Sequence, residues 1–240
     1  MNETAWTEPS ELPVLGSDDV HVWLAHLPAA RAHLARFVSL LSPDEQQRST
    51  RFRFAEHRER WEMARGVMRL LLARYSGTAP ADLRFVYNEH GKPAIRGSGI
   101  QFNSSHSGEF VVLAFTRAGA VGVDIEQVRD DFERLGEIGR KYFAPGEQEQ
   151  LEALPSSDRA RAFFDFWTRK EAFVKARGEG LFSGLDQFET LLAEPRIVSI
   201  SGAPATEWWM SALPEIEGYA GAVVVNAPSC TARFWKWMDR

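Results

Sequence analysis

Two short apolar runs in the middle of the chain constrain its fold more than any other feature. Val111–Phe115 and Val121–Ile125 each span five residues, are rich in Val, and are separated by five residues that include Gly119. Apolar runs of this length, bounded by turn residues, are typical of buried strands. The short connection predicts that the two strands form an antiparallel hairpin.

The flanking segments predict long helices and further strands. Ser42, Pro43 and Glu45 form the capping-box pattern that begins a helix, and helical periodicity continues in two pieces to about residue 75. Another long helix is expected over 158–177, with shorter helical segments ending near residue 140 and beginning near 143–147. Further strands are expected at 20–25, 83–87, 188–193, 196–201, 220–225 and 232–237.

The two halves of the sequence resemble each other in outline. Each contains a long helix and a strand of small apolar residues, VVLAF in the first half and GAVVV in the second. A chain of 240 residues is long enough for two domains of ordinary size. These observations favour an α+β fold of two similar lobes, residues 1–118 and 119–240.

Composition and charge exclude several classes of protein. A single cysteine permits no intramolecular disulfide and no cysteine zinc site. The acidic, proline-containing N-terminus does not resemble a signal peptide, and no apolar run approaches the ~20 residues of a membrane span. We therefore expect a cytoplasmic protein with no membrane partner. The net charge of −5 argues against a nucleic-acid partner.

One segment departs from this acidic balance. Residues 31–74 contain ten Arg against five Asp or Glu. Such a segment could hold a compact polyanion such as a nucleotide. On this segment alone, a solvated helix face with ion pairs is the simpler interpretation.

Two carboxylates interrupt the second apolar run. Because side chains alternate along a strand, Asp124 and Glu126 should project to one face, with Val123 and Ile125 on the other. Two acids this close are costly unless a cation or a basic partner neutralises them. Hard oxygen ligands without nearby cysteine indicate Mg²⁺, Mn²⁺ or Ca²⁺.

The helix expected over 158–177 carries a second polar cluster. Trp167, Glu171 and Lys175 are spaced four residues apart and should share one helix face. A surface ion pair between Glu171 and Lys175 would contribute only ~0.3–0.5 kcal/mol. Together with the carboxylates at 124 and 126, however, this cluster suggests a site for Mg²⁺ and phosphate.

The stretch FNSSHSG, residues 102–108, raises a choice between catalysis and binding. A serine–histidine–acid triad usually places its serine in a G-x-S-x-G turn, and this chain has none. Ser105 and His106 are adjacent in sequence, so in an extended segment they would face opposite ways. Binding of a phosphate by these side chains fits better than nucleophilic catalysis.

Three stretches together are similar to a known family. GKP with FNSSHSG, then VGVDIE, then FWTRKEAFVKARGEGL occur in the order found in 4′-phosphopantetheinyl transferases of the surfactin-synthetase-activating (Sfp-like) type, in its W-x-x-KEA variant. The resemblance runs from about residue 41 to residue 188. It implies a monomer of two α+β lobes related by a pseudo-twofold axis, with coenzyme A as co-substrate and Mg²⁺ (or Mn²⁺) bound in the cleft between them.

The resemblance also implies a reaction. Such enzymes move phosphopantetheine from coenzyme A to a serine of an acyl or peptidyl carrier protein and release adenosine 3′,5′-bisphosphate. Asp124, Glu126 and Glu171 would hold the metal. Lys175 would contact the diphosphate and stabilise charge as the bond breaks. Glu171 and Glu147 are alternative bases for the serine hydroxyl.

Other residues would bind the nucleotide of coenzyme A, chiefly its 3′-phosphate. By resemblance these are Arg48, Arg65, Lys92, Ser105 and His106. Where some relatives carry lysines early in the basic segment, this chain has Glu45. Carrier proteins are generally acidic, so the Arg-rich segment could also help to dock one. The resemblance further implies a role in polyketide or non-ribosomal peptide pathways, which broad-specificity members of the family usually serve.

Two other functions use the same residues. A metal-dependent nuclease or phosphodiesterase would employ the same carboxylates and lysine, although the net charge is wrong for a duplex binder. A catalytically silent binder of coenzyme A or of carrier proteins is the other alternative. The presence of both Glu171 and Lys175 argues against inactivation.

Overall fold

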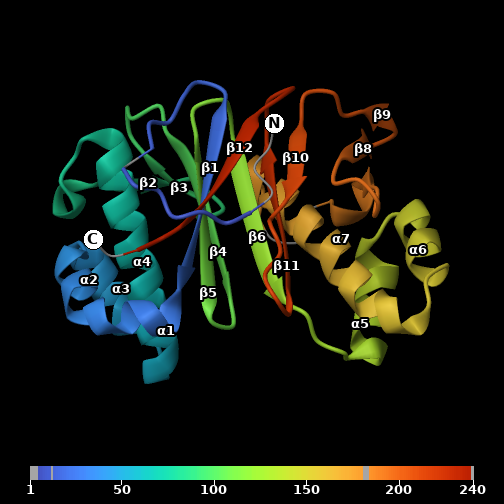
Figure 1. Ribbon diagram of the computed structural model, residues 1–240, viewed down its shortest axis with the longest axis horizontal. Coiled ribbons are helices and arrows are strands. Elements are labelled where there is room, and N and C mark those ends of the chain that lie inside the picture. The colour runs from blue at the N-terminus through green and yellow to red at the C-terminus, as the bar shows by residue number, and fades with distance from the viewer. Residues whose placement is uncertain (1–4, 12, 181–183, 239–240) are drawn as a thin grey trace.

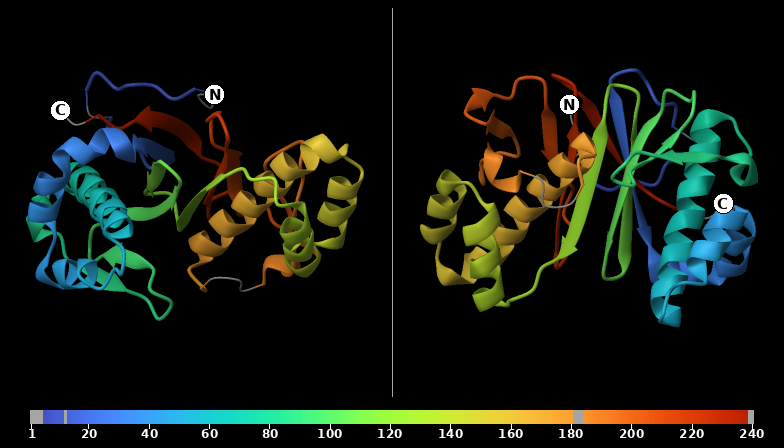
Figure 2. Two further views of the ribbon diagram at one scale, coloured as in Figure 1. Left: turned by 90° about the horizontal axis from the view of Figure 1, so that it is seen from below. Right: turned by 180° about the vertical axis from the view of Figure 1, so that it is seen from behind.

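The protein has an α+β fold with two lobes side by side (Figure 1). The computed structural model describes residues 5–11, 13–180 and 184–238, with 132–134 described in the backbone only. Helices lie at the two ends of the molecule and strands lie between them (Figure 2). The expected α+β class and two-lobe arrangement are therefore confirmed. Leu181, at the end of the last resembling stretch, lies outside the described residues.

The helices of the described chain fall into one group in each lobe. The first group is α1 Leu27–Ala30, α2 Leu34–Leu40, α3 Pro43–Ser49 and α4 Ala55–Ser76. The second group is α5 Phe132–Tyr142, α6 Pro145–Glu152 and α7 Ser156–Arg177. The expected helix over 43–75 does form in two pieces, and the capping box at Ser42 and Glu45 is present. Helix α2 has no counterpart among the sequence-based expectations.

The strands of the described residues form two larger sheets and two small ones. Their bounds are β1 Asp19–His26, β2 Phe85–Tyr87, β3 Pro93–Ile95, β4 Gln101–Ser107, β5 Phe110–Thr116, β6 Val121–Gln127, β7 Phe188–Thr190, β8 Ile197–Ile200, β9 Ala203–Pro204, β10 Trp209–Ala212, β11 Tyr219–Val225 and β12 Thr231–Lys236. The larger sheets have the orders β12-β1-β5-β4 and β10-β11-β6, and the small ones are β2-β3 and β7-β8-β9. The polar stretch 102–107 is thus a strand, which the sequence did not indicate.

The expected hairpin of Val111–Phe115 with Val121–Ile125 is wrong. Strand β5 is antiparallel to both β1 and β4, so both of its edges are occupied, and β6 pairs with β11 instead. The connection between β5 and β6 carries the chain from one sheet to the other. The two strands contribute to one apolar cluster, in which Val112 and Ala114 meet Val121 and Val123.

The core is arranged in layers that follow the alternation of side chains. One face of β5 contributes Leu113 and Phe115 to a cluster with helix α4, and its other face packs toward the second sheet. Helix α7 covers the outer face of β11, where Ala222 and Val224 meet Phe173. Each lobe therefore places one 22-residue helix on the outer face of its sheet.

The division at residue 118 remains a prediction. The last strand, β12, runs parallel to β1 and so joins the sheet of the first lobe. Within the described ranges, no helix combines the length and apolar character needed to cross a bilayer.

Candidate active site

A cavity of about 510 Å³ opens between the two lobes and is lined from both. The first lobe contributes basic and aromatic side chains, and the second contributes acidic ones together with Lys175. The residues considered below that line it are Arg48, Trp61, Arg65, Tyr87, Ser104, Ser105, His106, Asp124, Glu126, Trp167, Glu171 and Lys175. Of the predicted site residues, Lys92 and the alternative base Glu147 do not line this cavity, and the structure brings the others together around it.

Gly122 allows helix α7 to reach the strand that carries the acids. A Cβ atom at this position would lie within 3.0 Å of the carbonyl oxygen of Ala172 and the amide nitrogen of Ala176. Only a glycine lets a helix backbone approach a strand this closely. This contact brings the face of α7 that carries Glu171 and Lys175 against β6, which carries Asp124.

The acidic end of the cavity is a compact hydrogen-bonded cluster. The ammonium of Lys175 donates to Asp124 Oδ1 at 2.6 Å and to Ser105 Oγ at 2.9 Å. Ser105 Oγ in turn donates to Asp124 Oδ1 at 2.7 Å, and Ser107 Oγ donates to Glu126 Oε2 at 2.8 Å. Asp124 is only 2% exposed, so its charge depends on these partners.

Burial shifts the titration of the neighbouring carboxyls. The pKa of Glu171 is raised to about 7, first by burial and then by the negative charge of Asp124. The pKa of Glu126 is raised by the same two causes in the same order. Carboxyls that crowd one buried place in this way resist ionisation until a cation joins them.

The donor set suits a hard divalent cation, although its ligands are not already gathered. Buried oxygens Asp124 Oδ2 and Glu171 Oε1 have no hydrogen-bond partner. Such orphaned carboxylate oxygens are the atoms that Mg²⁺ prefers. However, in the described part of the chain no three His, Cys, Asp or Glu side chains form a ready-made ligand cluster. The chemistry of Asp124, Glu126 and Glu171 therefore fits a metal, whereas the cation beside Asp124 in this structure is the ammonium of Lys175.

The side of the cavity that α3, α4 and β2 of the first lobe contribute is basic and aromatic. Arg65 lies over the ring of Phe85 at 3.9 Å and donates to the Tyr87 hydroxyl at 3.0 Å. Its guanidinium also bonds to the buried carboxylate of Glu45, which is held as well by Arg69 at 2.6 Å. Glu45 therefore orients Arg65 and offsets part of its charge.

Arg48 and His106 are the more accessible cationic or titratable groups that the first lobe contributes to the cavity. The Arg48 guanidinium lies over the Trp61 ring at 5.7 Å, and both side chains line the cavity. His106 is an exposed residue of strand β4 that also lines it. Both groups are placed to meet an anionic ligand that enters from solvent.

Lys92 is not among the residues that line this cavity. Its ammonium donates to the carbonyl oxygens of Val121 at 3.0 Å and Ala176 at 2.8 Å. Burial lowers the pKa of Lys92 to about 8. The structure therefore gives the Lys92 ammonium backbone partners within the protein, although its neighbours Gly91 and Pro93 do line the cavity.

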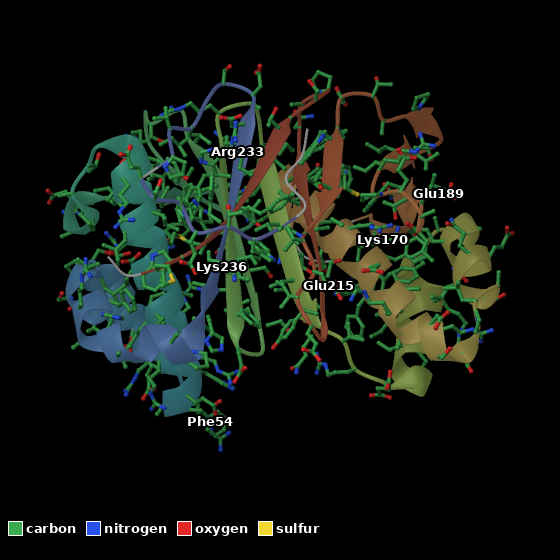
Figure 3. All side chains as sticks on the ribbon, in the orientation of Figure 1. Phe54, Lys170, Glu189, Glu215, Arg233 and Lys236 are labelled. Atoms are coloured by element: carbon green, nitrogen blue, oxygen red, sulfur yellow. The ribbon has the colours of Figure 1, made fainter. Side chains whose placement is uncertain are left out.

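Glu147, the alternative base, is a wholly buried structural residue. It caps helix α6 by accepting from the amide of Ala144 at 2.8 Å, and it accepts from both the amide and the hydroxyl of Thr190 at 2.9 Å. It also forms an ion pair with Lys170 at 2.7 Å, and both side chains are 0% exposed. Lys170 and Glu189 lie near each other in this part of the second lobe (Figure 3). Of the two candidate bases, only Glu171 lines the cavity.

Some lining residues were not anticipated. Trp61 and Tyr87 supply aromatic surface, but single aromatic residues in a helix and a strand carry no distinguishing pattern. Asn103 and Ser107 do not line the cavity, but they bond to β6 on either side of Ser105. They could have been found, because with Ser105 they form an alternating row of short polar residues. The amide of Val123 donates to Asn103 Oδ1 at 3.0 Å, so this row joins β4 to β6.

Comparison with known proteins agrees with this geometry. The model of the 4′-phosphopantetheinyl transferase superfamily matches residues 120–224, and a model described as 4′-phosphopantetheinyl transferase, N-terminal, matches residues 27–118. 4′-phosphopantetheinyl transferase HetI of Nostoc sp. is 33% identical over 99% of this chain and 100% of its own. 4′-phosphopantetheinyl transferase Sfp of Bacillus subtilis is 32% identical over 72% of this chain and 76% of its own. With two family models covering most of the sequence and a full-length relative, the chain belongs to the 4′-phosphopantetheinyl transferase superfamily.

Proposed function

We propose that this chain transfers 4′-phosphopantetheine from coenzyme A to a serine hydroxyl of an apo acyl or peptidyl carrier protein, in the manner of a holo-[acyl-carrier-protein] synthase. The reaction would depend on Mg²⁺, or on Mn²⁺, and release adenosine 3′,5′-bisphosphate. A monomer in the cytoplasm would carry it out. The observation that carries the proposal is one cavity lined by three carboxylates and Lys175 from the second lobe and by Arg48, Arg65 and His106 from the first.

The two groups of lining residues suit the two parts of coenzyme A. An adenosine carrying a 3′-phosphate needs cations and aromatic surface, which Arg48, Trp61 and His106 offer. Arg65 is partly neutralised by Glu45, so we assign most of the phosphate binding to Arg48 and His106. The diphosphate would then lie toward Lys175, whose ammonium is on the cavity wall.

The reaction joins the serine oxygen to the β-phosphorus of the diphosphate, which bears the pantetheine arm, and breaks that phosphorus's bond to the bridging oxygen. Lys175 would stabilise negative charge on the departing adenosine bisphosphate. Glu171 would accept the proton of the serine hydroxyl, because it is the candidate base whose side chain lines the cavity. When bound by Asp124, Glu126 and Glu171, the metal would neutralise diphosphate charge.

Mass spectrometry of apo carrier proteins tests the proposal. Incubation with the chain, coenzyme A and Mg²⁺ should add the mass of phosphopantetheine to the carrier. Glu171→Gln should lower kcat by about 10²–10⁴-fold, the usual contribution of a general base. Glu149→Gln, at an exposed acid of helix α6, is the matched control and should keep its rate. If no carrier from fatty-acid, polyketide and non-ribosomal peptide systems gains mass, the proposal is refuted.

A further inference from the structure

A lysine of the first lobe reaches the end of the long helix of the second. Lys92 lies in the turn between β2 and β3, and its ammonium donates to Val121 O at 3.0 Å and to Ala176 O at 2.8 Å. Val121 is the first residue of β6, and Ala176 lies in the last turn of α7. One ammonium group therefore bonds to both of the elements that carry the acidic cluster.

The turn that presents Lys92 is itself fixed against α7. The carboxamide oxygen of Asn88 accepts from the amides of His90 at 3.0 Å and Lys92 at 2.8 Å. Its carboxamide nitrogen donates to Gly178 O at 2.8 Å. Gly178 ends α7 with φ of +70°, and a Cβ there would lie 3.0 Å from Lys92 Cδ. The turn and the helix end are thus packed against each other.

These contacts satisfy groups that a helix cannot satisfy by itself. The last four carbonyl oxygens of an α-helix have no partner within the helix, and a cation near them is favourable because of the helix dipole. Ala176 O receives the Lys92 ammonium, and Gly178 O just beyond the helix receives the Asn88 carboxamide. The first lobe therefore caps the C-terminus of a helix that belongs to the second.

We infer that Lys92 is a positioning residue: from the first lobe it holds the end of α7 against the start of β6 and so fixes Lys175 relative to Asp124. Lys175 directly precedes Ala176, and Asp124 follows Val121 by three residues. Lys175 and Asp124 are joined by a hydrogen bond of 2.6 Å from Lys175 Nζ to Asp124 Oδ1, and this is the contact that Lys92 would keep in place. The inference rests on the proposed function for its consequence in catalysis, but the capping contacts are independent of it.

The inference differs from a direct role in binding coenzyme A. To reach a phosphate, the ammonium would have to leave both carbonyl oxygens, which would then be left without this donor. Burial of the ammonium, which lowers the pKa of Lys92 to about 8, also fits a place inside the lobe interface. The two roles predict opposite kinetic signatures.

Lys92→Met separates the two roles because it keeps the aliphatic stem and removes the charge and the donors. A positioning role predicts a kcat lower by about 10–100-fold with the KM for coenzyme A within about twofold, since small misplacements of reacting groups mainly slow the bound reaction. Hydrogen exchange at the amides of residues 174–178 should become faster in the same variant. A raised KM with an unchanged kcat, or no change in either, would overturn the inference.

Two controls keep the result interpretable. His106→Ala, at a residue that lines the cavity, should show the opposite pattern, a raised KM with kcat largely kept. If Lys92→Met does not fold, Lys92→Gln removes the same charge with a shorter polar side chain. In that variant too, a lower kcat with a nearly unchanged KM for coenzyme A would support the positioning role, and a raised KM with an unchanged kcat would contradict it. If the wild-type chain transfers nothing, the proposed function fails, whereas hydrogen exchange in residues 174–178 still decides whether Lys92 holds the helix end.

Discussion

Gly122→Ala adds one methyl group at the closest approach between helix α7 and strand β6. The new Cβ would lie within 3.0 Å of Ala172 O and Ala176 N, and both are backbone atoms that cannot rotate away. Normal contact distances are about 3.5–4.0 Å, so the helix has to move outward by more than about 1 Å. The movement would separate Lys175 on the helix from Asp124 on the strand, which are now joined at 2.6 Å.

The size of the effect follows from this displacement. Overpacking a well-packed interior costs about 1–3 kcal/mol of folding free energy. A misplacement of about 1 Å between reacting groups costs about 10²-fold in rate. We therefore expect a folded variant with moderately reduced stability and a kcat about 100-fold lower, while KM for coenzyme A changes little because the Arg48 end of the cavity lies in the other lobe.

The assay is carrier-protein modification under saturating coenzyme A, with urea unfolding measured on the same sample. Gly119→Ala is the matched control, because its Cβ would also lie within 3.0 Å of a backbone oxygen, that of Asn226, but outside the contact between α7 and β6. It should lose similar stability and keep its kcat. If Gly122→Ala keeps more than half of the wild-type kcat, the close approach does not set the geometry of the site.

Three further predictions follow from other parts of the molecule. His106→Ala should raise the KM for coenzyme A by about 3- to 10-fold and leave kcat within twofold, as initial rates against coenzyme A will show; a collapse of kcat alone would make the histidine catalytic. Burial lowers the pKa of His21 from 6.5 to about 4. As the pH falls from 6.5 to 4, the unfolded chain therefore takes up a proton that the folded chain does not, and the free energy of unfolding falls, by about 2 kcal/mol at pH 5. Urea unfolding at several pH values should show this component in the wild type and not in His21→Asn. Lys170→Met leaves the buried carboxylate of Glu147 without its cation and should lower the free energy of unfolding by about 3–5 kcal/mol. The double variant that also carries Glu147→Gln should regain part of this loss in urea unfolding. A loss below about 1 kcal/mol in Lys170→Met would contradict the reasoning.

The sequence predicts the local elements better than their partners. The start of α3 was readable because Ser42 and Glu45 are a local signal, and the capping box is present in the structure. The pairing of β5 was not readable, because its partner β1 lies about 90 residues away and nothing in VVLAF encodes that neighbour. The short connection between β5 and β6 favoured a hairpin of the two strands. In the structure both faces of β5 are buried, and β6 lies in a second sheet that faces the first.

Individual site residues show the same limit. The faces of β6 and α7 follow from periodicity, so Asp124, Glu171 and Lys175 could be predicted to lie together once the two elements meet. Lys92 and Glu147 matched motif positions equally well, yet their partners within the protein are backbone carbonyls in one case and Lys170 and Thr190 in the other. Short motifs identify residue types, whereas the direction of a long side chain depends on neighbours that are distant in sequence.

The polar strand β4 shows why the lobe interface and the reaction site depend on each other. β4 and β6 lie side by side at the seam between the two lobes, where side chains of β4 rather than its backbone accept hydrogen bonds from the backbone of β6. Asn103 Oδ1 accepts from the amide of Val123, and Ser107 Oγ accepts from the amide of Gln127 at 3.0 Å. Ser105, midway in the same row, bonds to Asp124. Each such bond contributes about 0.5–1.5 kcal/mol net, so the seam is held by several weak, cooperative contacts. The contacts that join the lobes therefore also orient the carboxylate of Asp124. A variant that loosens these contacts should slow the proposed reaction before it unfolds the protein.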